Sequence, residues 1–262
     1  GACTLRAAIQ EANARLNLAG GPDLIEFKIP GPGPYTIQPL SALPAITESV
    51  VLDATPQAGY AGTPIVELIG SSAGAGVSGL RTTTGGNTIK GLALNRFASS
   101  GILVQTGGGN TIEGNFLGLT PAGTVAPNGS SGIEIRTTGN TVGGVGAGNV
   151  ISGNTQFGIL LTGGTNTILS NRIGTNPAGT AAVANGLYGI YVTSAGNQIG
   201  GPTGGEGNLI SDNLRGGVAI TGATATGNLV QGNLIGTTAD GTAALANRNA
   251  GVTVSNASDN TI

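Results

Sequence analysis

The sequence predicts an all-β solenoid, a stack of coils built from short parallel strands and closed at its start by a short α-helix. Three observations predict this fold. Strings of the form Asn-x-Ile, Val or Leu recur every 23 to 32 residues, and strings such as GILV, GIEI and GIYV recur between them. The first residues of the chain instead space their apolar side chains as a helix does. Units of this size cannot bury a core alone and stack on one another.

A capping helix is expected within residues 1–20. Thr4 has the side-chain hydroxyl of an N-cap residue. One helical face is apolar throughout, at Leu5, Ala8, Ile9 and Ala12. Such a helix would cover the core that the first coil of a solenoid otherwise exposes. Cys3 is the single cysteine of the chain, and we expect it to pack within this cap.

Residues 21–86 are expected to form irregular first coils. Four strings in this segment have the composition of strands: LIEFKI, YTIQ, SVVLDA and PIVELIG. The strings PGPGP and TPQAGYAG lie between them and are typical of loops. We expect these coils, the cap and the regular coils that follow to form one domain.

Regular coils are expected from residue 87 to residue 262. The Asn residues that begin successive coils are Asn87, Asn110, Asn140, Asn166, Asn197, Asn228 and Asn260. Stacking would place their side chains above one another, and an amide that both donates and accepts can then bond its neighbour in a ladder. The Ile or Val two residues later would fill an interior column. Because 260–262 repeats Asn-Thr-Ile, we expect the natural protein to continue beyond this segment.

Two kinds of coil alternate in the regular region. NFLGLTPAGT, NRIGTNPAGT and NLIGTTADGT begin at residues 115, 171 and 233, which places them 56 and 62 residues apart. Within strings such as GILV and GIEI, the apolar residues lie two positions apart, which is the period of a strand with one buried face. The preceding Gly suits a bend or a close approach of two backbones.

The opening CTLRAAIQEAN resembles the Cys-Ser-Leu-Arg-Glu-Ala motif that begins many bacterial secreted and cell-surface β-helix proteins. Thr4 stands here at the position of Ser, and Ala7 at that of Glu. The later strings NTVGG, GNVISGN and GIEI resemble the parallel β-helix repeats of the same proteins. The resemblance implies a right-handed parallel β-helix and an extracellular or cell-surface location. It leaves the activity open, because one fold hosts many functions.

The composition argues against several partners and cofactors. Charged residues make up 8% of the chain and the net charge is −2, whereas nucleic-acid binding needs a surplus of Lys and Arg. The absence of His excludes Ser-His-Asp triads and His metal sites. No apolar run approaches the roughly 18 residues of a membrane span, so we expect no membrane insertion. We expect no cofactor, since the string ADGT offers one carboxylate, too few for Ca²⁺.

Candidate site residues are few. The β-helix proteins that this chain resembles include enzymes that cut polysaccharides. Such chemistry needs paired carboxylates or a base beside a cation. From residue 87 onward, no two carboxylates in adjacent coils share an offset from the coil's first Asn. Glu134 and Arg136 are expected to form a surface ion pair, with a catalytic pair as the alternative. Leu160 and Tyr191 would lie side by side and could form a small patch for a sugar ring.

Two further contacts are expected between adjacent coils. Lys90 and Glu113 share the same offset from their Asn and could form a stacked ion pair. Phe157 and Tyr188 each precede the bend Gly of their coil, and we expect the two rings to stack as packing.

These observations favour a non-catalytic extracellular module, a stalk, an adhesin-like segment or a matrix scaffold, with polysaccharide or other cell-surface components as partners. The first alternative is a β-helix protein that binds or degrades polysaccharide, as a lyase or a glycoside hydrolase. Three or more charged side chains converging in a groove would favour the enzyme. The second alternative is a filament subunit that self-associates through the open strand edge of its C-terminal coil.

Overall fold

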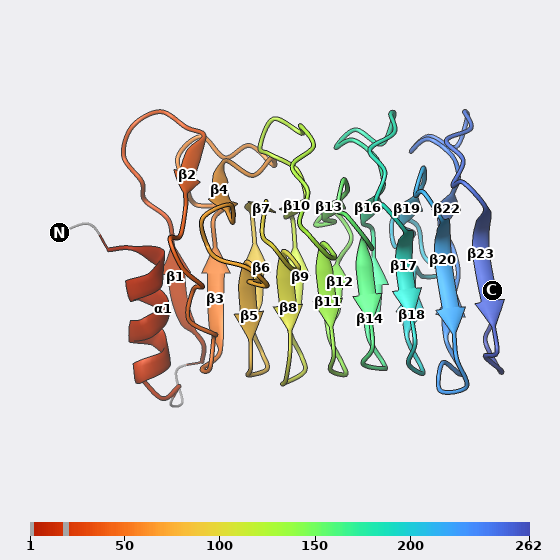
Figure 1. Ribbon diagram of the computed structural model, residues 1–262, viewed down its shortest axis with the longest axis horizontal. Coiled ribbons are helices and arrows are strands. Elements are labelled where there is room, and N and C mark those ends of the chain that lie inside the picture. The colour runs from red at the N-terminus through yellow and green to blue at the C-terminus, as the bar shows by residue number, and fades with distance from the viewer. Residues whose placement is uncertain (1–2, 18–20) are drawn as a thin grey trace.

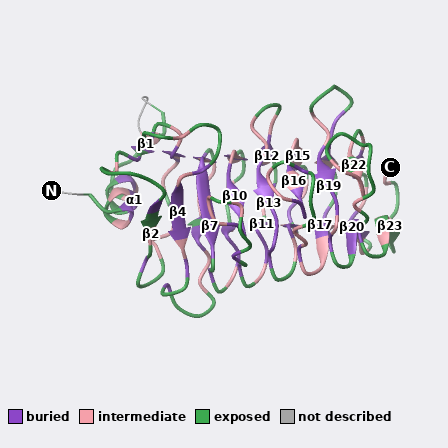
Figure 2. Ribbon diagram, turned by 90° about the horizontal axis from the view of Figure 1, so that it is seen from above, coloured by how far each residue is buried: buried purple, intermediate pink, exposed green. Residues whose placement is uncertain are grey.

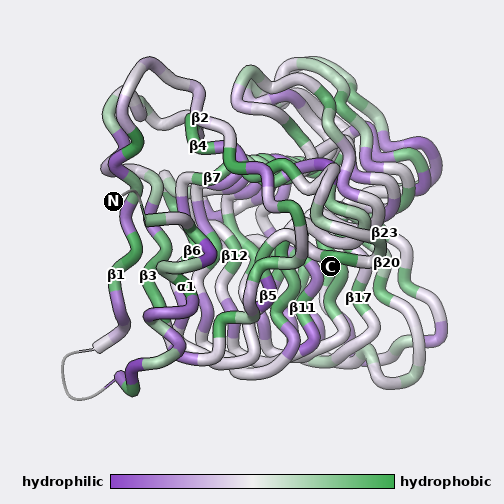
Figure 3. The backbone as a smooth tube through the Cα atoms, turned by 60° about the vertical axis from the view of Figure 1, so that its left-hand side comes forward, coloured by the Kyte–Doolittle hydropathy of each residue, from purple (hydrophilic) through white to green (hydrophobic). Residues whose placement is uncertain are grey.

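The computed structural model describes residues 3–17 and 21–262. It shows one helix followed by a row of stacked coils that runs the length of the molecule, with the two ends of the chain at opposite ends of the row (Figure 1). Each coil after the first contributes one strand to each of three sheets, and the first coil joins the third sheet only through a bridge between Ile46 and Thr82. Figure 3 looks partly along the stack, so that the coils lie behind one another. The strands of neighbouring coils pair in parallel, as predicted.

The three sheets are named A, B and C. Sheet A contains β1 (Asp23–Glu26), β3 (Val50–Asp53), β6 (Thr88–Lys90), β9 (Thr111–Glu113), β12 (Thr141–Gly143), β15 (Thr167–Leu169), β18 (Gln198–Ile199) and β21 (Leu229–Val230). Sheet B contains β2 (Tyr35–Ile37), β4 (Val66–Ile69), β7 (Leu92–Asn95), β10 (Phe116–Leu117), β13 (Val150–Ile151), β16 (Arg172–Ile173), β19 (Leu209–Ile210) and β22 (Leu234–Ile235). Sheet C contains β5 (Leu80–Thr82), β8 (Ile102–Val104), β11 (Ile133–Ile135), β14 (Ile159–Leu161), β17 (Tyr188–Val192), β20 (Gly216–Thr221) and β23 (Ala250–Ser255).

The core is the space enclosed by the three sheets. Branched aliphatic side chains fill it because every second residue of a strand points inward. The predicted interior column is confirmed on sheet A, where each member is at most 4% exposed: Ile89, Ile112, Val142, Ile168, Ile199 and Val230. Figure 2 shows buried strands along the body and exposed loops around them. The core is thus one continuous rod rather than a compact centre.

The helix α1 (Leu5–Ala14) caps the N-terminal end of this rod. The Thr4 hydroxyl accepts a hydrogen bond from the Ala7 amide at 3.2 Å, which confirms Thr4 as the N-cap. The apolar face of α1 packs on the first coils: Leu5, Ile9 and Ala12 are buried, and Ala8 is partly buried. Cys3 was expected to pack here, but it is exposed, because it precedes the helix and lies outside the packed face.

Polar side chains of the cap also bind the first coil. The Arg6 guanidinium donates to the carbonyl oxygens of Ser41 and Ala42 at 2.9 and 2.8 Å. Asn13 donates to the Ala45 carbonyl and accepts from the Thr47 amide, as a neighbouring strand would. These contacts satisfy backbone groups that the open edge of a sheet would leave unpaired.

The predicted ladder of asparagines is confirmed at the entry to sheet A. Each side-chain amide donates to the amide oxygen of the next Asn, from Asn87 to Asn260, at 2.7 to 3.2 Å. The same oxygen also accepts from the backbone amide of the preceding ladder member, as between Asn87 and Asn110 at 3.0 Å. Most members are at most 1% exposed, so the ladder satisfies polar groups inside the molecule.

Two more ladders, which the sequence did not lead us to expect, begin the other two sheets. At the entry to sheet B the members are Asn115, Asn149, Asn171, Asn208 and Asn233. Before sheet C they are Asn128, Asn154, Asn185, Asn213 and Asn247. Each corner of the coil therefore carries a ladder along the long axis.

Loops of two kinds account for the alternation of the coils. Three coils carry a hairpin after sheet B, each closed by an antiparallel bridge: Leu119–Val125, Thr175–Ala182 and Thr237–Ala244. The hairpins rise from one edge of the solenoid (Figure 1). The two coils between them carry Gly-rich loops after sheet A, at residues 144–149 and 200–208. In the described part of the chain, no helix is long and apolar enough to cross a membrane.

Candidate functional site

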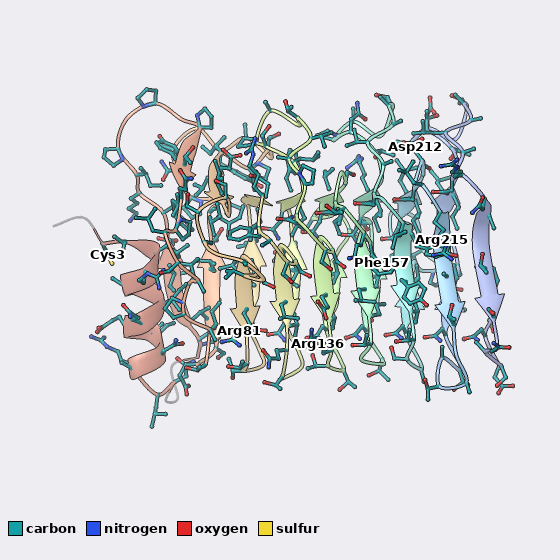
Figure 4. The ribbon with its side chains drawn as sticks, viewed as in Figure 1. Cys3, Arg81, Arg136, Phe157, Asp212 and Arg215 are labelled. Carbon is teal, nitrogen blue, oxygen red and sulfur yellow. The ribbon has the colours of Figure 1, made fainter. Side chains whose placement is uncertain are left out.

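The outward face of sheet C brings the four predicted site residues together. The strand register places Glu134 beside Leu160, and Leu160 beside Tyr191, in three successive coils. Arg136 follows Glu134 by two residues and lies on the same side (Figure 4). The whole outward column of sheet C reads Arg81, Leu103, Glu134, Leu160, Tyr191, Ala219 and Thr253.

Three aromatic rings gather on this face. The rings of Phe157 and Tyr191 stack with centroids 4.8 Å apart and an interplanar angle of 24°. Tyr188 lies against Tyr191 at 5.7 Å, and the guanidinium carbon of Arg215 lies 5.5 Å from the centre of the Tyr188 ring. The prediction that Phe157 stacks on Tyr188 was wrong, because the Tyr191 ring contacts both. We call Phe157, Tyr188, Tyr191 and Arg215 the aromatic platform.

Glu134 and Arg136 form the expected ion pair. Arg136 Nε lies 2.7 Å from Glu134 Oε1, and the Ser100 hydroxyl donates to Oε2 at 3.2 Å. Glu134 is 9% exposed, so both of its oxygens are engaged in a nearly closed setting. Glu134 is the one carboxylate on the described strands of sheet C. Two carboxylates flanking a bond, the arrangement used by glycosidases, are therefore not assembled on these strands.

Arginines make the face locally positive although the chain is slightly acidic. Arg81, Arg136 and Arg215 lie along it at the positions labelled in Figure 4. Arg81 donates to the Gln105 side chain at 3.3 Å, and Arg215 lies over Tyr188. A guanidinium can offer a fork of donors to a carboxylate or sulfate while its flat face stacks on a ring.

A second charged group lies on sheet A and was not predicted, because Glu26 and Asp53 precede the regular coils that begin at Asn87. The register aligns Glu26, Asp53, Lys90 and Glu113 in four successive coils. Two carboxylates in adjacent coils, Glu26 and Asp53, therefore do share a column. Lys90 was expected to pair with Glu113, but it pairs instead with Asp53, with 3.0 Å between Nζ and Oδ2. The string SVVLDA was the signal that could have placed Asp53 in this column.

The bonds of Asp53 show that it fixes a turn. Its Oδ1 accepts from the backbone amide and the hydroxyl of Thr55 at 2.8 and 2.7 Å. Burial alone would raise the pKa of Asp53, but the bonds from Thr55 and the charge of Lys90 outweigh it and lower that pKa. Burial and the charge of Asp53 raise the pKa of the nearby Tyr60 hydroxyl, which keeps it protonated. A protonated phenol beside an already bonded carboxylate is a poor general base.

Among residues 3–17 and 21–262, no group of three or more His, Cys, Asp or Glu side chains is placed to hold a metal ion. A family model described as right handed beta helix region matches residues 78–262. The match covers more than half of the chain, and the chain therefore belongs to this family of right-handed β-helix proteins. The match also confirms the predicted right-handed parallel β-helix. No curated protein matches the sequence.

Proposed function

We propose that this chain is a non-catalytic β-helix module of an extracellular or cell-surface protein, and that it binds a polysaccharide along the outward face of sheet C. The observation that carries this proposal is the aromatic platform, whose rings contact one another at 4.8 and 5.7 Å across neighbouring coils. The resemblance of residues 3–13 to the cap motif of secreted proteins supports the location.

The platform has the properties that sugar recognition requires. Aromatic rings present a rigid apolar face at little conformational cost, and the tyrosine hydroxyls add donors and acceptors at the edge. Phe157, Tyr188 and Tyr191 are each partly exposed, so the parts of the rings that do not contact one another or Arg215 can contact a ligand. The platform extends along the row of coils, which suits a chain molecule better than a small one.

The contacts of Glu134 support binding without cleavage. Its carboxylate is bonded to Arg136 and Ser100, and it has no second carboxylate on the strands of its sheet. In this arrangement Glu134 holds the Arg136 guanidinium at the surface. That role needs no proton transfer, and because Glu134 bonds only Nε, the Nη groups of Arg136 can bond an acidic or hydroxyl group.

The test is affinity electrophoresis of the chain in gels that contain neutral or acidic polysaccharides. Tyr191→Ser removes the central ring and should weaken retention at least tenfold, because stacking and apolar contact are lost together. Tyr60→Ser makes the same change on another face and should leave retention unchanged. Circular dichroism confirms that both variants are folded.

Two outcomes would contradict the proposal. If no polysaccharide retards the chain, or if both variants lose retention equally, the platform is not a binding site. If the chain shortens a polysaccharide in solution, the module is an enzyme, and Glu134→Gln then tests whether the ion pair takes part in catalysis.

A further inference from the structure

A groove separate from the aromatic platform lies over sheet B, between the hairpins and the Gly-rich loops. Its volume is about 450 Å³, which lies within the range of small-ligand sites. The residues that matter for its chemistry are Gly148, Arg172, Gly207, Leu209, Leu234 and Ala239. We call it the Arg172 groove.

Arg172 is a charged residue in a column whose neighbouring members are apolar. It is the outward residue of β16, and the register places it between Val150 and Leu209, which are 4% and 5% exposed. Arg172 itself is partly buried. Within the described chain, its guanidinium makes no ion pair or hydrogen bond with any protein group. A cation in such a position is costly unless an anion joins it.

Backbone forms the walls of the groove. On one side, Gly148 and Gly207 belong to the two Gly-rich loops. On the other side lies Ala239 of the third hairpin. The Gly179 backbone packs beside it, where a Cβ would come within 2.7 Å of Ala239 Cβ, 2.8 Å of Leu209 Cδ2 and 3.5 Å of Arg172 Nε. The Ala239 amide bonds the Gly179 carbonyl at 2.9 Å and so fixes the two hairpins against each other. A wall made of backbone offers donors and acceptors. Glycine is required at Gly148 and Gly207 by close coil packing, because a Cβ there would overlap the carbonyl oxygens of Ser170 and Gly232.

The carboxylates near the groove do not neutralise Arg172. Glu206 accepts a hydrogen bond from the Thr203 amide of its own loop at 3.1 Å. Asp240, next to Ala239, accepts from the Thr242 amide at 3.1 Å and from the Thr238 hydroxyl. Both carboxylates thus bond their own turns, and neither pairs with the Arg172 guanidinium. The guanidinium can therefore pair with an anionic ligand.

We propose that the Arg172 groove binds a carboxylated sugar of monosaccharide size. The carboxylate would pair with the guanidinium fork of Arg172, for which Arg is better suited than Lys. The hydroxyls would bond the glycine backbone, and the apolar face of the ring would lie against Leu209 and Leu234. This site lies on sheet B and is independent of the polysaccharide face on sheet C.

The test is a titration followed by ¹H–¹⁵N NMR at constant ionic strength, with sodium glucuronate, glucose and sodium acetate as probes. Glucuronate should shift the Arg172 Nε–H signal and the amide signals of Gly148 and Gly207 in a saturable way. Glucose lacks the charge and acetate lacks the polyol, so each should bind at least tenfold more weakly at the same signals. Arg172→Gln should weaken glucuronate binding at least tenfold, and Arg172→Lys should restore it only in part.

The matched control is Arg248→Gln, which removes the same charge from an exposed position and should leave binding unchanged. Because Arg172 points outward from its strand, Arg172→Gln is expected to keep the fold, and circular dichroism checks this. Equal affinity of wild type and Arg172→Gln, or equal affinity for glucose and glucuronate, would overturn the proposal. Equal affinity for acetate and glucuronate would overturn the sugar part of it.

Discussion

At the scale of single residues, glycine and asparagine constrain one another. Gly174 has φ of +89°, which side chains with a Cβ rarely adopt, and it lies directly beneath Asn213 of the next coil. A Cβ at this position would come within 2.7 Å of Asn213 Oδ1 and would overlap the Ser211 carbonyl oxygen. Gly143 and Gly200 stand in the same relation to Asn171 and Asn233. The glycines are therefore required by the ladders that lie above them.

Gly174→Ala should destabilise the fold by about 3 kcal/mol, because left-handed strain and steric overlap act together. Urea unfolding followed by circular dichroism measures the change. Gly144→Ala is the matched control, since a Cβ there meets no atom within 4 Å and φ is not positive. It should be neutral or slightly stabilising. Equal losses in the two variants would contradict the argument.

A second prediction at this scale concerns Asp212, whose pKa is raised by burial. A raised pKa means that the charged carboxylate is less favourable in the folded than in the unfolded chain. Its penalty grows as pH rises from the unfolded pKa, near 3.8, through the folded pKa, and is complete above it. Asp212→Asn should therefore raise the urea midpoint at pH 7 and leave it almost unchanged at pH 3. Asn also tolerates the φ of 60° found here.

Asp240 provides the contrast. Hydrogen bonds from Thr238 and Thr242 lower the pKa of Asp240 to about 2. Its charged form therefore favours the folded chain above the unfolded pKa, and this contribution is lost as pH falls toward 2. Asp240→Asn should lower the urea midpoint at pH 7, opposite in sign to Asp212→Asn. A lower midpoint for Asp212→Asn at pH 7 would contradict the role of burial at Asp212, and a higher midpoint for Asp240→Asn would contradict the role of the hydrogen bonds at Asp240.

At the scale of elements, the strands are short and the ladders hold them in register. Many strands have only two or three residues, and a slip of one residue would turn their apolar side chains outward. An Asn ladder opposes such a slip, because its members can bond only when the coils are in step. The hydrophobic attraction of the core is non-directional and does not fix the register of the strands, whereas the hydrogen bonds of the ladder do.

Asn166→Ala should cost about 3 kcal/mol, because the lost amide leaves the Asn140 side chain and backbone donors without their acceptor inside the molecule. Asn260→Ala alters the last member of the same ladder, which is partly exposed, and should cost about 1 kcal/mol or less. Thermal unfolding of the two variants measures the difference. If the ladder did not stabilise the fold, the two variants would show small and equal losses of stability.

The sequence predicted the first ladder because its Asn is followed directly by a short apolar string, and the register then followed from that string. The other two ladders follow loops whose lengths change from coil to coil, so their alignment depends on the stacked structure. At the site, the column through Glu134, Leu160 and Tyr191 was predictable for the same reason. The direction of the Phe157 ring was not, because a side chain before a bend Gly can turn toward either neighbour.

At the scale of the whole molecule, the two ends of the row differ. The N-terminal end is covered by α1, whereas β22 and β23 are the last strands of their sheets in this chain. Side chains that would be interior or covered in a middle coil are exposed there, with Leu234 at 41% and Val254 at 43%. An uncovered strand edge with apolar neighbours favours pairing with another chain.

The 262-residue chain should therefore associate as its concentration rises, and sedimentation equilibrium measures its mass. Val254→Lys places a charge on the edge strand β23 and should shift the chain toward the monomer. Leu40→Lys, at an exposed position near the other end, should not. A monomer mass that is independent of concentration in the unmodified chain would remove self-association.

The direction of the ladders also determines how the molecule responds to force. Their hydrogen bonds, like those between strands, run from coil to coil and so lie along the long axis (Figure 1). A pull on the two ends loads the coils in series, and the outermost coil can detach by breaking only its own bonds. A sideways load is shared by many coils at once. Under tension the chain would therefore lengthen in steps, one coil at a time.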